Sequence, residues 1–479
     1  MLKLERTRPE SVGISPAVLL RYLHGLERTG FIAHGIMLAR RGKVAFEINY
    51  KPFQPDIAHY LCSCSKSVAA TAVGFALAEN LFSLDDKIVE LLPEKLDGTP
   101  HEYVAAMTVR HLLTMSTAFS DYEPKTDDMT RDFLNNTPDH YPGTVFGYDS
   151  LGTYTLCEIV QKFAGMNLEE YLRPRLLEPL GFEGALFPVS KQGVCRGNGA
   201  FCMRPEDMMK FGLLYLNGGR WDGKQILPAG WAEEATAGHV SCAASDGTYR
   251  ESYGYKFWRV QNNGFACLGL AGQTIVMHPD KDLVFVGTAN GFQTDNHYFH
   301  MELMWQLVYP ELADGPIPFE DAAYAELTDY IKNAEAFLPR GEVTSAAGRA
   351  YSGRFLSVKE NTIGCEGFTL TLTEGFGELV LKTARGDCRV PFGYGTHAPG
   401  PDDLHKNYAT AGKTDCPSGF AAAGRWVNEK TLVIQSHAPD TLTYFLITVH
   451  FGERAVVLEI APFGIYRYDG IPCRLNHIL

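Results

Sequence analysis

The pattern of apolar residues changes character once along this chain, near residues 311–319. Before this point helical and strand patterns alternate, whereas after one more helix, predicted over about residues 321–337, short alternating strands dominate. Gly315, Pro316 and Pro318 lie at the change, and glycine and proline interrupt regular structure. The pattern predicts a mixed domain at residues 1–312, a linker with a connecting helix at 313–345, and an all-β domain at 346–479.

The C-terminal segment alternates apolar and polar residues with a period of two, between turns rich in Gly, Asn and Asp. This period is typical of antiparallel strands that bury one face. Many short strands in succession indicate a meander that forms a small, barrel-like domain. The clearest strand patterns cover residues 368–373, 378–381, 431–434, 442–451 and 455–460.

Two hairpin patterns frame the mixed domain. Strand patterns at 35–40 and 43–48 flank Arg41-Gly42, a two-residue turn signal, and a second hairpin pattern covers residues 273–288. The residues between the hairpins have mainly helical patterns. We therefore expect an α+β domain whose antiparallel sheet, flanked by helices, is built from both ends of the segment, with a helical subdomain inserted in the middle.

Charge and composition limit the partners and the compartment. The 43 Lys+Arg against 56 Asp+Glu give a formal net charge of −13 without a long basic run, so we expect neither nucleic acid nor a membrane surface as partner. The most apolar helical run, residues 68–78, has only about half of the roughly 20 residues that span a bilayer, and no secretory signal is evident. The 11 cysteines lack zinc-ligand spacing and indicate reduced thiols, so we expect a cytoplasmic protein.

The strongest chemical signal is Ser63-Cys64-Ser65-Lys66 at the head of the apolar run 67–78. Ser63 and Lys66 share one face of the predicted helix. The helix dipole and burial both oppose a positive charge there, which favours a neutral amine able to take the proton from Ser63. The helix N-terminus also supplies backbone N–H groups for an oxyanion. Such a motif arises by chance in long chains, although here it occurs once and precedes the most apolar helix.

This helix resembles the active-site helix of the serine β-lactamase and penicillin-binding-protein superfamily, especially its class C-like branch of lactamases, esterases and D-stereospecific peptidases. Further landmarks of that branch follow in the same order over about residues 8–308. The resemblance implies a β-lactamase-like fold for the mixed domain and a serine hydrolase. The matching landmarks are residues 10–15, 80–86, 142–154, 178–181, 204–212 and 219–227.

The resemblance also implies roles for single residues near position 150. Tyr148 falls where the branch carries the tyrosine of its Tyr-x-Asn motif, which implies that Tyr148 moves protons together with Lys66. Ser150 replaces the Asn of that motif, so an amide that would contact the substrate is missing. Ser150 is therefore a predicted, though altered, substrate-binding residue.

The candidate for the third family motif, Lys-Thr-Gly or His-x-Gly on an inner strand, is Gly269-Leu270-Ala271-Gly272-Gln273. Leu270 replaces the cation and Ala271 replaces the hydroxyl, and Leu270, Ala271 and Gly272 are predicted to contact substrate. The backbone N–H groups of Ser63 and Gln273 are the predicted oxyanion donors. An ordinary edge strand that contains glycines remains an alternative for this segment.

Together these features predict a serine hydrolase that acts through an acyl-enzyme on small esters or amides, with no metal or cofactor. A small-molecule substrate is the expected partner, and the oligomeric state is open. Three alternatives remain: a β-lactamase or D-amino-acid peptidase acting on peptidoglycan-like substrates, a catalytically inactive penicillin-binding-like module, and an interaction protein whose barrel is the working part. Leu270 and Ala271 offer a carboxylate neither charge nor hydroxyl, so we expect β-lactams to be poor substrates unless an arginine lies elsewhere in the cleft.

Overall fold

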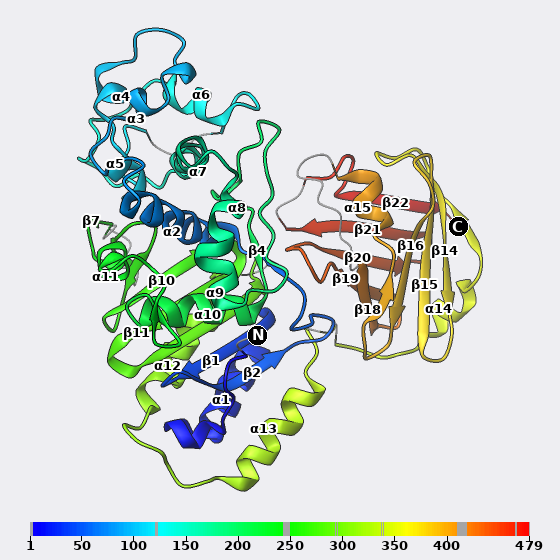
Figure 1. Ribbon diagram of the computed structural model, residues 1–479. Coiled ribbons are helices and arrows are strands. Elements are labelled where there is room, and N and C mark those ends of the chain that lie inside the picture. Colours follow the sequence, from blue (N-terminus) through cyan, green and yellow to red (C-terminus); the bar gives the residue numbers. More distant parts are fainter. Residues whose placement is uncertain are drawn as a thin grey trace.

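Two large sheets, each with its own core, organise the chain in the computed structural model (Figure 1). The structure describes residues 3–119, 123–242, 250–292, 294, 296–336, 338, 340–409, 419–464 and 467–478. The first sheet has the strand order β2-β1-β12-β11-β10-β9-β8-β7. Its strands are β1 (Ile32–Arg40), β2 (Lys43–Asn49), β7 (Val240–Ser241), β8 (Arg250–Tyr253), β9 (Trp258–Val260), β10 (Gly264–Gly269), β11 (Gln273–His278) and β12 (Leu283–Asn290).

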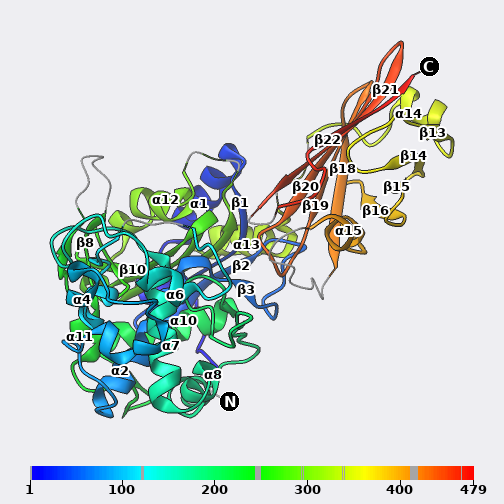
Figure 2. The same ribbon diagram turned by 90° about the horizontal axis from the view of Figure 1, so that it is seen from above.

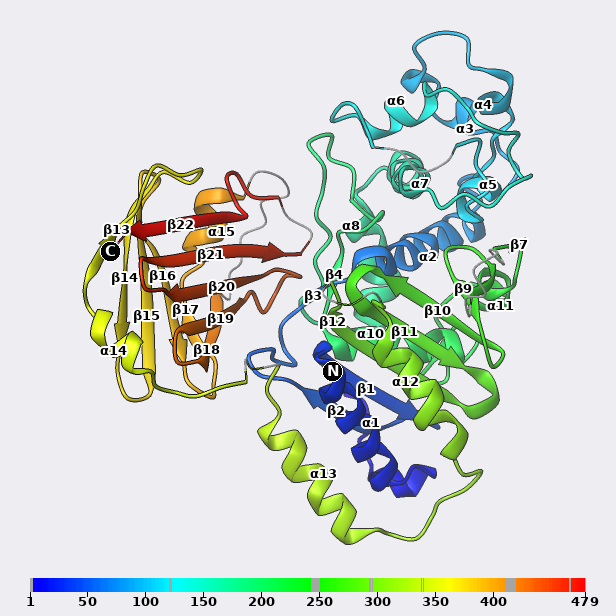
Figure 3. The same ribbon diagram turned by 180° about the vertical axis from the view of Figure 1, so that it is seen from behind.

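The first sheet is assembled from the two ends of its segment, as the sequence predicts. β1 pairs antiparallel with β2 on one side and with β12 on the other, in a register that runs from Ile32 opposite Asn290 to Arg40 opposite Leu283. Arg41 and Gly42 have φ values of 54° and 75°, the left-handed conformation that a two-residue hairpin turn requires. Figure 3 labels both β1 and β12, which the backbone pairing places side by side.

Helices cover both faces of the first sheet. On one face α1 (Pro16–Thr29) packs against α12 (Phe299–Leu307), and on the other α10 (Pro205–Leu216) packs on β1, β11 and β12. Alternation along β1 separates the two cores, because Met37 contacts the α10 side while Ile36 and Leu38 lie in the core beneath α1.

A helical subdomain is inserted between β2 and β7. Its central helix, α2 (Ser65–Ala78), packs against α7 (Ser150–Ala164) and is buried from Ser65 to Ala76, which explains why its sequence is apolar on all sides. The other elements here are α3 (Ile88–Leu91), α4 (Glu102–Ala106), α5 (Val109–Leu113), α6 (Met129–Leu134), α8 (Leu168–Leu172), α9 (Glu178–Leu180), α11 (Trp231–Thr236), β3 (His59–Tyr60), β4 (Cys202–Met203), β5 (Arg220–Trp221) and β6 (Lys224–Gln225). Within the described ranges, no helix has both the length and the apolar character needed to cross a bilayer.

The second sheet is nearly closed into a barrel. Its strand order is β13-β14-β15-β16-β18-β19-β20-β21-β22, with β17 paired to β18. The two outer strands approach each other, since the Lys359 amide donates to the Asn476 carbonyl at 3.4 Å and the His477 ring lies 2.7 Å from the Ser357 carbonyl. The α+β fold with a barrel-like C-terminal domain is thus confirmed. The elements are α14 (Ala346–Tyr351), β13 (Phe355–Ser357), β14 (Cys365–Leu372), β15 (Phe376–Thr383), β16 (Cys388–Gly393), β17 (Ala398–Gly400), α15 (Asp403–Tyr408), β18 (Phe420–Asn428), β19 (Thr431–His437), β20 (Tyr444–Phe451), β21 (Ala455–Phe463) and β22 (Cys473–Ile478).

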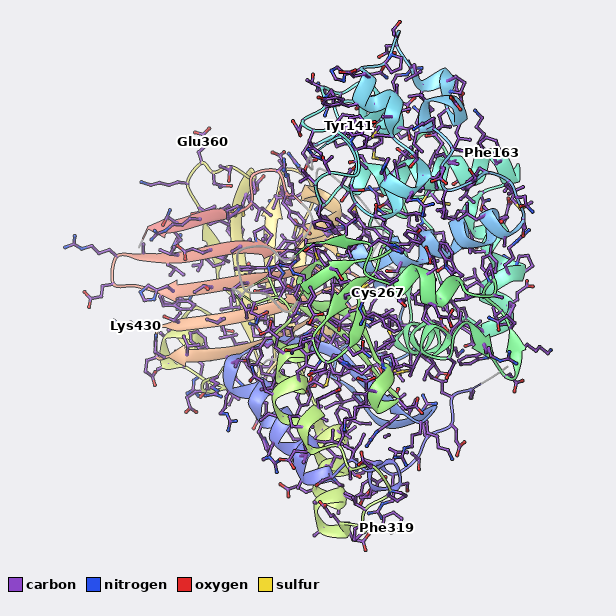
Figure 4. The ribbon with its side chains drawn as sticks, turned by 90° about the vertical axis from the view of Figure 1, so that its left-hand side faces the viewer. Tyr141, Phe163, Cys267, Phe319, Glu360 and Lys430 are labelled. Atoms are coloured by element: carbon purple, nitrogen blue, oxygen red, sulfur yellow. The ribbon has the colours of Figure 1, made fainter. Side chains whose placement is uncertain are left out.

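The two sheets contact each other through one end of the barrel (Figure 2). α13 (Asp321–Asn333) lies before the segment that leads from the first sheet to the second. It ends before residue 337, the predicted end of this helix, which lies outside the described residues. Figure 4 shows Lys430 and Glu360 on the barrel away from Cys267 in the first sheet. Tyr444, at the near end, packs into the core beneath α1. Each sheet lies entirely on one side of the predicted boundaries at residues 312 and 346, which themselves remain predictions.

Candidate active site

Ser63 lies in a short 3₁₀ turn, Cys62–Cys64, immediately before α2. Cys62 has a φ of 47°, in the left-handed region that residues with a side chain seldom adopt, so the backbone bends sharply just before Ser63. The sequence predicts Ser63 within the first turn of the helix, whereas Ser63 lies in the 3₁₀ turn, two residues before α2 begins at Ser65. Ser63 is half-buried, while Cys62 and Cys64 on either side are buried.

Lys66 holds the position that the sequence predicts for a base. Its Nζ donates a hydrogen bond to Ser63 Oγ at 3.0 Å and a second one to the backbone carbonyl of Asn198. Lys66 is 1% exposed, so water has almost no access to its amine. The carbonyl of Asn198, which has no sequence signal, fixes the direction of the Lys66 side chain toward Ser63.

Tyr148 completes the predicted group. Its ring centroid lies 5.1 Å from Lys66 Nζ, and its ring stacks on that of Trp258 with centroids 5.8 Å apart and an angle of 12°. Trp258 is in turn held edge-on by Tyr253, with centroids 4.7 Å apart. The structure therefore brings Ser63, Lys66 and Tyr148 together, and an aromatic cluster fixes the tyrosine from behind.

Asp149 anchors Tyr148 from the next position in the chain. Its buried carboxylate accepts hydrogen bonds from the backbone N–H groups of Leu151 at 2.9 Å and Gly152 at 3.1 Å, and so caps the N-terminus of α7. Thr117 Oγ1 donates to the same carboxylate at 3.1 Å. Burial raises the pKa of Asp149, which these hydrogen bonds partly offset. Ser150 begins α7 and is half-buried, outside the described lining of the pocket.

A second buried lysine, Lys256, lies behind the predicted group. Its Nζ is 3.1 Å from Met115 Sδ, and its backbone carbonyl accepts a hydrogen bond from Ser67 Oγ at 2.6 Å. Burial lowers the pKa of Lys256, while the negative charge of Asp149 raises it in part and the charge of Lys66 lowers it further. Lys256 therefore adds to the electrostatic environment of Lys66 without lining the pocket.

The third predicted motif differs from expectation in its local structure. Residues 270–272 form a tight turn between β10 and β11, with Ala271 at a φ of 62° and Gly272 at 96°, so the segment is not a continuous strand. A Cβ on Gly269 would lie 2.3 Å from the carbonyl oxygen of Leu61. Only glycine therefore allows this turn to pack against the backbone that leads into Ser63.

The turn presents the side chain of Leu270, and not that of Gln273, to the pocket. Leu270 is 46% exposed and lines the pocket beside Ser63. Gln273 is fully buried, and its side-chain amide donates to the carbonyl of Ala289 at 2.7 Å. Neither Ala271 nor Gly272 belongs to the described lining, and the Ala271 N–H donates to His297 Nδ1 at 3.1 Å.

A pocket of about 340 Å³ opens above Ser63. Its volume lies within the range of sites that hold small molecules. Most of its lining is aromatic or apolar, and it contains one permanent charge among the described lining residues, that of Arg250. The residues that line it are Ser63, Phe146, Tyr148, Cys242, Arg250, Trp258, Leu268, Leu270 and Tyr298.

Several residues of this site could not be singled out from the sequence. Arg250 and Trp258 belong to two short strands without any motif, and Lys256 and Asn198 lie in connecting segments. Asp149 alone has a usable local signal, since an Asp directly before a helical pattern is typical of an N-cap.

Comparisons with known proteins agree with this geometry. The profile of the family described as Beta-lactamase matches residues 23–307, more than half of the chain. The 6-aminohexanoate-dimer hydrolase of Paenarthrobacter ureafaciens is 25% identical over 291 residues, which cover 55% of this chain and 74% of that protein.

Two solved structures share the fold. The octameric penicillin-binding protein homologue of Pyrococcus abyssi has a TM-score of 0.50 at 14% identity and covers 96% of this chain and 99% of its own. EstCE1, a hydrolase with promiscuous acyltransferase activity, has a TM-score of 0.51 at 16% identity and covers 61% of this chain and 99% of its own. On the match of its family profile, the chain belongs to the Beta-lactamase family, within the superfamily of serine β-lactamases and penicillin-binding proteins.

Proposed function

We propose that this protein is a serine hydrolase that cleaves small amides or esters through an acyl-enzyme. The observation that carries the proposal is the 3.0 Å hydrogen bond between Lys66 Nζ and Ser63 Oγ at the base of a pocket large enough for a small molecule. A buried amine at this distance can accept the hydroxyl proton as the oxygen attacks a carbonyl carbon. Family membership supports a hydrolase of this kind.

In the proposed reaction, Ser63 Oγ forms a bond to the substrate carbonyl carbon while its proton passes to Lys66. Lys66 and Tyr148 then return a proton to the leaving amine or alkoxide, whose bond to the carbonyl carbon breaks. A water molecule attacks the resulting acyl-enzyme by the same route in reverse and releases the acid and free Ser63. The centre of the Tyr148 ring lies 5.1 Å from Lys66 Nζ, and Tyr148 lines the same pocket as Ser63, which supports this role.

Backbone N–H groups stabilise the oxyanion in this proposal. Ser63 supplies one N–H at the start of α2, and the turn at residues 270–273 supplies the second. The sequence assigned the second donor to Gln273. We keep this assignment, because the Gln273 carbonyl accepts a hydrogen bond from Cys64 Sγ at 3.3 Å, which places the Gln273 backbone next to the residue that follows Ser63.

Amides are the substrates that the comparisons favour. The relative from Paenarthrobacter ureafaciens acts on a dimer of 6-aminohexanoate, whose two units an amide joins. Esters remain part of the proposal because they need only the nucleophile, the base and the oxyanion donors. The main alternative is an inactive module that keeps the fold to bind a ligand, and the intact contact between Ser63 and Lys66 argues against it.

Labelling with a neutral fluorophosphonate probe tests the proposal directly. We expect stoichiometric modification of the full-length protein at Ser63, and no modification of Ser63→Ala at an unchanged thermal midpoint. Lys66→Ala and Tyr148→Phe should each lower kcat/KM for p-nitrophenyl butyrate by roughly 10²–10⁴-fold. An unlabelled wild-type protein, or a Ser63→Ala variant that keeps more than about a tenth of the activity, would show that the assignment is wrong.

A further inference from the structure

Lys256 is a buried cation that no step of the proposed reaction uses. It is 2% exposed, its backbone φ of 66° lies in the left-handed region, and it lies outside the described lining of the pocket above Ser63. We propose that Lys256 is a positioning residue that holds Tyr148 and Lys66 in reacting geometry from behind. This inference rests on the proposed function, since it concerns the proton transfers of the same site.

Met115 connects Lys256 to the backbone on both sides of Tyr148. Its Sδ lies 3.1 Å from Lys256 Nζ and accepts the Asp149 N–H at 3.2 Å, while its carbonyl accepts the Gly147 N–H at 2.9 Å. Tyr148 stands between Gly147 and Asp149 in the chain. A shift of the Lys256 ammonium would therefore displace the Met115 sulfur and, with it, one of the two bonds that fix the backbone around Tyr148.

Both residues of this bridge have backbone conformations that are rare for residues with a side chain. Met115 has a φ of 57° and Lys256 one of 66°, and both residues are buried. Such conformations persist only where the surrounding structure holds them, and they cluster at functional sites. The Lys256 N–H donates to the Leu113 carbonyl at 3.2 Å, which is one contact of this kind. The fold, and not local preference, thus imposes the geometry of the bridge.

The backbone of Lys256 also reaches the helix that carries Lys66. Its carbonyl accepts a hydrogen bond from Ser67 Oγ at 2.6 Å. Ser67 directly follows Lys66 in α2, so this bond fixes the helical turn from which Lys66 Nζ reaches Ser63 Oγ. Lys256 is therefore linked, directly or through Met115, to both backbone segments that carry the proposed proton-transfer groups.

The ammonium of Lys256 also balances the buried carboxylate of Asp149. Burial raises the pKa of the Asp149 carboxyl and lowers that of the Lys256 amine, and the charge of each residue offsets part of this effect in the other. An ionised Asp149 is the stronger acceptor for the Leu151 and Gly152 N–H groups at the start of α7. Loss of the cation favours a proton on Asp149 and so weakens the cap next to Tyr148.

This role implies that substrates differ in their dependence on Lys256. p-Nitrophenoxide is a weak base and leaves without a proton, whereas phenoxide is a stronger base and gains more from a proton donor. In the proposed reaction Lys66 and Tyr148 supply that proton. A change that displaces Tyr148 should therefore slow phenyl butyrate more than p-nitrophenyl butyrate, although both esters carry the same acyl group.

Lys256→Met tests the proposal in the full-length protein, because it removes the charge and keeps an unbranched side chain. We expect kcat/KM for phenyl butyrate to fall by roughly 10- to 100-fold, through kcat at a nearly unchanged KM, since Lys256 lies outside the described pocket lining. The ratio of kcat/KM for p-nitrophenyl over phenyl butyrate should rise by roughly 3- to 10-fold. Fluorophosphonate labelling of Ser63, from which fluoride leaves without a proton, should change least.

Lys210→Met is the matched control. Lys210 is also a buried lysine, at 3% exposed, but its Nζ donates to the Gly181 carbonyl at 2.7 Å and it lies outside the described pocket lining. This variant should lower the thermal midpoint and leave the ester ratio unchanged. Met115→Leu removes the sulfur acceptor and should raise the ratio. Its combination with Lys256→Met should add little, because both changes break the same bridge.

The outcomes distinguish this inference from the proposed function. A protein that is labelled at Ser63, but whose Lys256→Met variant keeps the wild-type ratio or loses activity equally on both esters, would contradict the positioning role alone. If Lys256→Met does not fold, Met115→Leu decides, and an unchanged ratio in that variant contradicts the proposal. A wild-type protein that neither reacts with the probe nor hydrolyses either ester would contradict the proposed function itself.

Discussion

The side-chain amide of Asn290 donates a hydrogen bond to the backbone carbonyl of Leu442 at 2.9 Å, and so joins the last residue of β12 to the turn between β19 and β20. Leu442 is 1% exposed and packs with Cys62 and Ala271. Cys62 directly precedes Ser63, and Ala271 lies in the turn that presents Leu270. The barrel thus supports the two backbone segments beside the pocket.

Leu442→Ala should lower both the stability and the activity of the protein. Truncation of a buried leucine costs about 2–5 kcal/mol, and the cavity would lie against Cys62. Because small displacements of reacting groups are costly, we expect kcat/KM to fall by roughly 10-fold. Val427→Ala, at an exposed apolar residue of the same sheet, is the control and should change neither the thermal midpoint nor kcat/KM appreciably. Equal kinetics in wild type and Leu442→Ala would exclude this support role.

The N-cap of α7 offers a second prediction. Asp149→Ala removes the acceptor for the Leu151 and Gly152 N–H groups, and such a loss costs about 1–2 kcal/mol. It also frees the backbone next to Tyr148, so activity should fall more steeply than stability does. Asp149→Asn, which keeps an acceptor oxygen, should retain more of both.

The matched control for this experiment is Asn167→Ala. Asn167 caps α8 in the same manner, with its side chain accepting from the Glu170 N–H, but it lies outside the pocket lining. Thermal unfolding and p-nitrophenyl butyrate kinetics are measured on all three variants. If Asn167→Ala lost as much activity as Asp149→Ala, the activity lost in Asp149→Ala would reflect a general loss of stability and not the position of Tyr148.

Acid should destabilise the protein through histidines buried where the two sheets meet. His34 stacks on Phe53 at 3.7 Å, Phe53 contacts His437, and burial lowers the pKa of His34 and His437 well below the usual value. Burial also lowers the pKa of His59 to about 4. The unfolded chain therefore binds more protons than the folded one between about pH 6.5 and pH 4. Stability is complete above this window and is lost as the pH falls through it.

The thermal midpoint should be level from pH 8 to about pH 6.5 and then fall. A single histidine whose pKa is lowered to about 4, as for His59, corresponds to a loss of about 3 kcal/mol in the free energy of unfolding. His437→Phe, which keeps an aromatic ring without a titrating nitrogen, should flatten the lower part of the curve. His450→Gln on the exposed surface of β20 is the control and should leave the curve unchanged. A midpoint that stayed constant down to pH 4.5 would contradict the prediction.

Nitrocefin should be a poorer substrate than small activated esters. The turn at residues 270–272 offers its carboxylate no cation and no hydroxyl, and the loss of one charge-assisted hydrogen bond corresponds to roughly 10- to 150-fold. A kcat/KM for nitrocefin above that for p-nitrophenyl butyrate would overturn this expectation.

Local patterns were sufficient to predict most of the fold. The Arg41-Gly42 turn, the all-round apolar α2 and the period-two strands after residue 346 each reflect a single local requirement, and each has the predicted form. The chain departs from prediction where one backbone contact overrides the local pattern. Residues 269–273 are predicted as one strand, but Gly269 ends β10 against the Leu61 carbonyl and residues 270–272 turn the chain into β11, which begins at Gln273.

Sequence motifs identified only some of the residues of the candidate site. Ser63, Lys66 and Tyr148 were found because their spacing follows helix geometry or a family landmark. Arg250 and Trp258 reach the pocket through the pairing of β8 with β9, a tertiary contact with no periodic trace in the sequence. Part of the pocket lining therefore consists of residues that are hard to identify without a structure.

The pairing of β1 with β12 has a consequence for synthesis on the ribosome. At about 5–20 residues per second, Leu283–Asn290 is translated roughly 12–50 s after Ile32–Arg40. During this interval one edge of β1 has backbone groups with no partner strand, which is the kind of edge that joins neighbouring chains. The nascent chain must therefore be protected, by its own helices or by a chaperone, until β12 arrives. Any fragment that ends before residue 283 keeps this open edge, and we expect it to aggregate.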